Sequence, residues 1–127
     1  MNAEETGRVL AKCASYDRRK TGDADTIAWL QVLGDLPYSD CIAAVVAHYT
    51  DSTDWIMPAH VRRRVRDIRD ARLEATEVPE PPRELAGNPP AYRAALRAAR
   101  LAIADGRDPA DAMLAVASRV RRELEAS

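Results

Sequence analysis

The side chains best suited to metal or nucleophilic chemistry in this sequence are two cysteines and two histidines: Cys13, Cys41, His48 and His60. Thiolates and imidazoles are the usual ligands of zinc, which needs several of them at characteristic spacings. The spacings here match no such pattern, and Cys41 and His48 would lie two helical turns apart, too far to hold one ion. We therefore expect two buried free thiols and two partly exposed histidines, with no metal and no cofactor.

A catalytic site is not predicted either. A Cys–His pair needs a third group that orients the histidine, and nothing in the sequence points to one. Acidic side chains are plentiful, but their positions are typical of helix caps and exposed helix faces. The five glycines are scattered, so they form no glycine-rich phosphate loop. We expect a protein that is not an enzyme.

The most informative cluster is a run of basic residues between positions 58 and 76. The segment contains six arginines and only three acidic residues. The arginines are Arg62, Arg63, Arg64, Arg66, Arg69 and Arg72, and the acidic residues are Asp67, Asp70 and Glu74. At 100° per residue, Arg62, Arg66 and Arg69 fall on one helical stripe, as arginines that contact DNA phosphates would. The candidate contacts to DNA or to an acidic partner are therefore Arg62, Arg63, Arg66 and Arg69.

Two observations keep a simpler interpretation open. Arg63–Asp67 and Arg66–Asp70 have the i,i+4 spacing of ion pairs that only stabilise an exposed helix. In addition, residues 35–57 contain four aspartates and no Lys or Arg, so the two segments together predict a dipolar surface. A dipolar surface suits a partner protein at least as well as DNA.

Four aromatic side chains offer another possible binding surface: Trp29, Tyr38, Tyr49 and Trp55. Exposed rings at such positions would stack on the bases of single-stranded nucleic acid. We expect core and core-edge positions instead, because the domain is small and contains no Phe.

Helical periodicity predicts the elements that position these residues, and no segment shows the period-two alternation of a strand. The expected helices span residues 3–16, 24–33, 37–49, 58–75, 91–104 and 109–125. Asp23 or Asp25 would cap the second helix, Gly34 would end it, and Pro37 and Pro58 would open the next two. Inward positions would hold Val9, Leu10, Cys13, Ile27, Trp29, Leu30, Cys41, Ile42, Val45, Val46, Tyr49, Val61, Val65 and Ile68. The fold class is all-α.

Five prolines between positions 79 and 90 suggest a division of the chain. The predicted parts are a compact four-helix domain at 1–76, an extended and unpacked Pro-rich linker at 77–90, and a helical hairpin at 91–127. The apolar stripes on the two helices of the hairpin are narrow and rich in Ala. Leucines such as Leu101 and Leu114 are expected to face the other helix of the hairpin. Alone it would be marginal, so it docks on the front domain, dimerises, or waits for a partner. Its candidate partner contacts are Arg93, Arg97, Arg100, Leu114 and Arg121.

Length and charge limit the choice of function. The 127 residues, 46% hydrophobic and 31% charged, fit one soluble globular domain with an appendage. The net charge of the whole chain is −1, which predicts neither a nucleic-acid nor a membrane partner. No apolar run approaches the roughly 20 residues of a membrane span, and two cysteines suit a reducing cytoplasm. Only Lys12 and Lys20 are lysines, so almost every cation is a guanidinium.

The stretch from Trp29 to Ile68 resembles the phage replisome-organiser family, the helicase loader-and-inhibitor proteins of double-stranded DNA phages. The family pattern is a Trp-containing helix, an Asp-x-Pro-Tyr turn, a helix ending near Tyr, and a Pro that opens the next helix. The matching residues here are Trp29, Leu33, Asp35, Leu36, Pro37, Tyr38, Tyr49, Met57, Pro58, Ala59, His60 and Val61. The resemblance covers about a third of the chain and carries over no catalytic residue.

The resemblance implies a small helical domain followed by a tail that binds the replicative helicase and keeps it inactive until delivery. We therefore expect a non-enzymatic phage or prophage DNA-replication accessory protein, a helicase loader or adaptor. Its partner would be the replicative helicase or another replisome protein, with DNA and a second copy of the chain as further partners. The alternatives are a small DNA-binding regulator using the Arg-rich helix and an inhibitor of a host protein.

Overall fold

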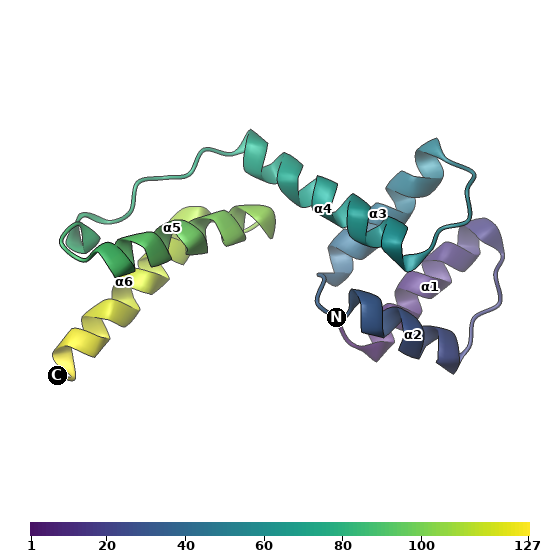
Figure 1. The fold of residues 1–127 in the computed structure, drawn as a ribbon, viewed down its shortest axis with the longest axis horizontal. Coiled ribbons are helices and arrows are strands. Elements are labelled where there is room, and N and C mark those ends of the chain that lie inside the picture. Colours follow the sequence, from purple (N-terminus) through teal and green to yellow (C-terminus); the bar gives the residue numbers. More distant parts are fainter. The chain divides into compact units, whose positions relative to one another are not determined.

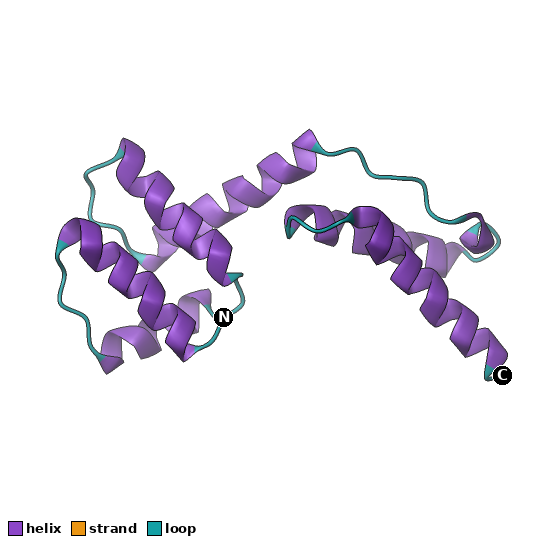
Figure 2. Ribbon diagram, turned by 180° about the vertical axis from the view of Figure 1, so that it is seen from behind, coloured by secondary structure: helices purple, strands orange, loops and turns teal.

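The protein is built from helices alone, so the all-α prediction is confirmed. The computed structural model describes residues 1–127 and contains six α-helices, one short 3₁₀ helix and no strand (Figures 1 and 2). The elements are α1 (Ala3–Asp17), α2 (Asp23–Leu33), α3 (Tyr38–Asp51), α4 (Pro58–Ala75), η1 (Arg83–Leu85), α5 (Pro89–Ala104) and α6 (Pro109–Glu125). Every helix boundary lies within two residues of its predicted position.

The chain divides into two compact units, Met1–Ile68 and Arg69–Ser127, which we call the front unit and the tail unit. Helix α4 begins in the first and ends in the second. No single helix is both long and apolar enough to cross a membrane; by length and composition alone, α2 and α3 together pass as a bent pair.

Local capping sets the starts of the first two helices. The Asn2 side chain accepts a hydrogen bond from the Glu5 backbone N–H, and the Glu5 carboxylate accepts one from the Asn2 N–H, which forms a capping box. Helix α2 starts after Gly22, whose N–H donates to the Asp25 carboxylate. Asp25 thus contributes to the cap as predicted, but from inside the first turn.

Residues 34–37 turn the chain sharply between α2 and α3. Gly34 follows the last residue of α2, and Pro37 immediately precedes α3 instead of occupying its first turn. The axes of the two helices differ in direction by 104°. The amino group of Met1 donates to the Gly34 and Leu36 carbonyls at 2.6 and 3.1 Å, so a positive charge lies at the C-terminal end of α2.

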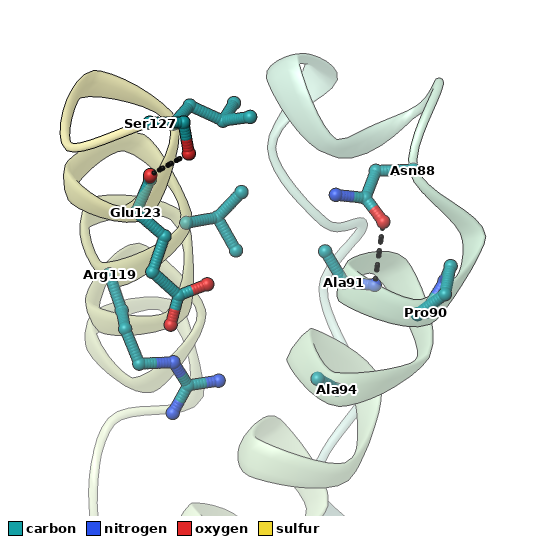
Figure 3. Close-up of a pocket in the computed structure, with 9 residues that line it drawn as sticks. Asn88, Pro90, Ala91, Ala94, Arg119, Glu123 and Ser127 are labelled. Atoms are coloured by element: carbon teal, nitrogen blue, oxygen red, sulfur yellow. Dashed lines mark hydrogen bonds between the residues drawn. The ribbon is translucent and has the colours of Figure 1, made fainter.

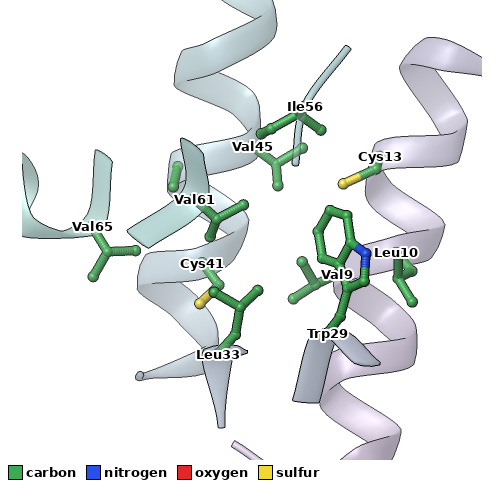
Figure 4. Packing of buried hydrophobic residues seen from close by; sticks show 11 residues of the cluster. Val9, Leu10, Cys13, Trp29, Leu33, Cys41, Val45, Ile56, Val61 and Val65 are labelled. Carbon is green, nitrogen blue, oxygen red and sulfur yellow. The ribbon is translucent and has the colours of Figure 1, made fainter. Parts of the chain in front are cut away.

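The front unit has one apolar core, in which α1 packs against both α2 and α3 (Figure 4). The buried residues are Val9, Leu10, Cys13, Trp29, Leu33, Cys41, Ala44, Val45, Ile56, Val61 and Val65. Trp29 is buried as expected, but Ile27 and Val46 were wrongly placed inside: Ile27 is 60% exposed and Val46 also faces outward. Helix α2 is apolar around most of its circumference, so its composition does not show which face is buried.

The tail unit is held by small side chains between α5 and α6. The shared core contains Leu85, Ala91, Ala95, Ala99, Met113, Val116 and Ala117. Leu101 and Leu114 were expected to face across the hairpin, but both are 54% exposed. Alanines bring the two helix backbones close together, and the longer leucine side chains are left on the outside.

The Pro-rich segment was predicted to be unpacked, and this prediction is wrong at position 78 and at residues 83–85. Residues 83–85 form η1, and Leu85 is 1% exposed in the core of the tail unit. Val78 is partly buried against the same core. A hairpin lined by alanine leaves apolar surface that needs a cover, and Leu85 supplies part of it.

Candidate functional site: the arginines of α4 and α5

Three of the α4 arginines are engaged with carboxylates of the chain itself. Arg62 makes a bidentate contact with Asp35, at 2.6 and 3.1 Å, and donates to the Val32 carbonyl at 2.7 Å. Hydrogen bonding from Arg62 lowers the pKa of Asp35. Arg64 pairs with Asp51 at 2.6 Å, and Arg69 pairs with Asp105 at 2.7 Å inside the tail unit.

These pairs change the predicted charge pattern. The aspartates of residues 35–57 were expected to form an acidic surface opposite the basic one. Asp35 and Asp51 are instead neutralised by Arg62 and Arg64, and Asp40 is buried. The predicted dipolar surface is therefore replaced in large part by intramolecular ion pairs. These pairs form because the turn at 34–37 and the end of α3 lie beside α4.

Arg63 and Arg66 are the exposed arginines of α4 without a carboxylate partner. Neither predicted i,i+4 pair, Arg63–Asp67 or Arg66–Asp70, forms, which reflects the small free energy of exposed pairs. The four side chains share one exposed face, on which two positive groups are followed by two negative ones. A face of mixed charge is a poor surface for a polyanion.

Helix α5 presents a different pattern. Arg93, Arg97 and Arg100 are all exposed, none forms an ion pair, and the helix contains no acidic residue. At 100° per residue the three lie within about 60° of one another. The buried alanines of the helix lie on the opposite side. Of the predicted tail contacts, these three lie together on one stripe.

The remaining predicted tail contacts lie elsewhere on the tail unit. Arg121 of α6 contacts both carboxylate oxygens of Glu84 at 2.9 Å, so it ties α6 to η1. Leu114 lies beside a shallow apolar depression of 280 Å³, whose lining also includes Pro79, Pro82 and Met113. Arg121 thus has an internal partner, whereas Leu114 remains available on the surface.

A larger groove opens between the start of α5 and the end of α6, with a volume of 460 Å³ (Figure 3). Ala91, Ala94 and Val120 line it, with the charged Arg119 and Glu123 among its other residues. Leu124, at 70% exposure, also lines the groove, so the apolar stripe of α6 continues beyond its contact with α5.

The histidines and cysteines are arranged as structural groups. His48 was expected to be partly exposed, but it is 4% exposed, and its Nε2 lies 2.7 Å from the Asp54 carbonyl oxygen. His60 accepts the Met57 N–H at Nδ1, which caps α4, and its ring lies 5.3 Å from that of His48. Burial, the Arg63 charge and the neighbouring His48 lower the pKa of His60.

Both thiols are buried, as predicted. Burial raises the pKa of Cys13 and of Cys41 to about 11. A thiol with such a pKa is a weak nucleophile at neutral pH, because little thiolate is present. No group of three His, Cys, Asp or Glu side chains is arranged to hold a metal ion.

Sequence reasoning missed a polar cluster that closes the front unit. The Asp17 carboxylate accepts hydrogen bonds from Arg19 and from the Tyr49 hydroxyl, both at 2.6 Å. Arg19 also donates to the Ile56 carbonyl, and the Ile56 N–H donates to the Tyr49 hydroxyl oxygen. The Arg19 guanidinium lies 4.2 Å from the ring centroid of Trp55, which is 52% exposed and not in the core as expected.

A helix-turn-helix geometry between α2 and α3 was not predicted from the sequence. The 104° angle and the four-residue turn between α2 and α3 match that motif. In such proteins the second helix enters the major groove. The exposed positions of α3 are Ser39, Ala43, Val46, Thr50 and Asp51, and residues 35–57 hold no Lys or Arg. Helix α3 therefore lacks the cations that contact the phosphate backbone.

Comparison of the chain with protein-family models, with curated proteins and with solved structures finds no significant match.

Proposed function

We propose that this chain is a non-enzymatic DNA-replication accessory protein of a phage or prophage, a helicase loader or adaptor. In this proposal the front unit is a rigid platform, and the tail unit binds the replicative helicase. The same tail would hold the helicase inactive until it is delivered to DNA.

The observation that carries the proposal is the position of the motif residues in the fold. Trp29 lies in the core, residues 34–37 form the turn before α3, and Pro58 is the first residue of α4. Tyr49 lies near the end of α3, where its hydroxyl joins Asp17 to Ile56. Each element of the family pattern therefore has a structural task in one compact unit, as a shared platform requires.

The test is co-elution with purified replicative helicase of the host or of the phage. We expect the full chain to co-elute with the helicase hexamer and a truncation ending at Ala75 to elute alone. Circular dichroism and tryptophan emission first establish that the truncation is folded, because both tryptophans lie before residue 69. Failure of the full chain to associate with either helicase would refute the proposal.

The DNA-binding regulator remains the second candidate, on the strength of the unpaired Arg63 and Arg66. It predicts duplex binding that weakens steeply with salt. It also predicts that the combined change Arg63→Ala and Arg66→Ala abolishes binding. Duplex binding unaffected by this change would exclude α4 as the contact, and capture of a host protein other than a helicase would favour the inhibitor.

A further inference from the structure

Helix α5 is the only one of the six α-helices that carries basic residues and no acidic one. Its stripe of Arg93, Arg97 and Arg100 repeats at i, i+4 and i+7 and spans about 10 Å of helix length. None of the three forms an ion pair, in contrast to Arg62, which is held by Asp35. The stripe therefore presents three guanidiniums whose hydrogen-bond donors are available to a partner.

The surroundings of the stripe favour an acidic protein over nucleic acid as its partner. Leu101, at 54% exposure, lies on one flank of the stripe and the half-buried Leu96 on the other. Apolar side chains beside arginine are typical of protein interfaces, where arginine is enriched and apolar area is buried. The chain as a whole carries a net charge of −1, which gives no long-range attraction for a nucleic-acid backbone.

We infer that the α5 stripe is a docking surface for an acidic amphipathic helix of a partner protein. Carboxylates at i, i+4 and i+7 on such a helix have the same axial spacing as the three arginines, so each guanidinium meets one carboxylate. A leucine beside those carboxylates covers Leu101. This inference deepens the proposed function and rests on it in assigning the partner to the tail unit and in taking the helicase as that partner.

The test compares the full chain with two triple variants that each remove three exposed positive charges. The stripe variant is Arg93→Gln, Arg97→Gln and Arg100→Gln. The matched control is Arg18→Gln, Arg83→Gln and Arg122→Gln, at exposed positions outside α5. Each protein is titrated against purified replicative helicase, against a synthetic helical peptide with glutamates at i, i+4 and i+7 beside a leucine, against its glutamine analogue, and against mixed-sequence duplex DNA.

We expect the stripe variant to bind the helicase and the glutamate peptide at least about tenfold more weakly than the wild type, since three ion pairs are lost. The control should bind within about twofold of the wild type, and the glutamine peptide should not bind. Equal binding by the stripe variant and the wild type overturns the inference and leaves the proposed function intact. Stripe-dependent binding of the glutamate peptide without any binding of the helicase supports the inference and refutes the proposed function. Stripe-dependent binding of the duplex in preference to the peptide overturns the inference and assigns the stripe to nucleic acid.

Discussion

Removal of the Asp17 carboxylate should destabilise the front unit far more than removal of an exposed carboxylate on the same helix. The Asp17 and Arg19 side chains are each 7% exposed, and the carboxylate also receives the Tyr49 hydroxyl. Asp17→Ala leaves the Arg19 charge buried without its partner. The loss of one member of a buried pair costs about 3–5 kcal/mol, a large fraction of the roughly 5–15 kcal/mol that stabilises a whole domain.

The matched control is Glu4→Ala, which removes the exposed Arg8–Glu4 pair of α1. Exposed pairs contribute about 0.2–1 kcal/mol, so the control should change stability by no more than that. Urea unfolding followed by tryptophan emission is the assay, because Trp29 and Trp55 both lie in the front unit and report on it alone.

A double-mutant cycle with Arg19→Ala separates the pair from the rest of the network. We expect the double variant to lose less free energy of unfolding than the sum of the losses in the two single variants, because it leaves no charge unpaired. If Asp17→Ala costs less than about 1 kcal/mol, as the exposed control does, then water solvates Arg19 and the buried-pair argument is wrong.

Three further predictions follow from burial and from the pKa shifts. Trp29→Ala should cost about 3–5 kcal/mol by the same urea assay, since the indole is in the core; a cost below about 1 kcal/mol would contradict this. The pKa of His60 is lowered in the fold, so protons favour the unfolded chain. Stability should therefore fall as the pH drops below the unfolded pKa of about 6.5, and His60→Gln should flatten that dependence in a pH series of unfolding curves. Cys13 and Cys41 should react with Ellman's reagent at neutral pH only after urea unfolding, since burial raises the pKa of each to about 11; rapid reaction of the folded protein would contradict this.

The helices were readily predicted from sequence because their signals are local. Pro58 and Pro109 each open a helix as their fixed backbone angle predicts, and Asp108 accepts the Ala110 N–H as a cap. The apolar stripe of Val61 and Val65 also gave the correct buried face of α4. Local chemistry and periodicity thus sufficed for the positions of elements in this chain.

The candidate contacts could not be ranked from sequence because ion pairing depends on tertiary neighbours. Arg62 and Asp35 are 27 residues apart, and only the turn between α2 and α3 brings them together. The helical wheel placed Arg62 and Arg66 on one stripe correctly, yet it could not show that only Arg66 lacks a carboxylate partner. For α5 the wheel was sufficient, because no acidic residue of that helix competes for the arginines.

Position 85 illustrates the same limit for apolar residues. A leucine within a segment rich in proline shows no periodicity, so composition predicted an extended linker. Its burial depends on the shallow surface that alanines leave on α5. The cover of that surface is supplied by a neighbour in space and not by a pattern in the sequence.

The all-arginine character of the α5 stripe also determines how a cell or an experimenter can modify it. Lys12 and Lys20, the only lysines, both lie in the front unit, so acetylation of lysine side chains cannot remove charge from the tail unit. Guanidinium groups stay protonated across the whole range in which proteins remain folded. Any pH dependence of docking at this stripe must therefore originate in the carboxylates of the partner. Amine-reactive cross-linkers will likewise report on the front unit only, and mapping the tail contact requires reagents directed at arginine or at carboxylates.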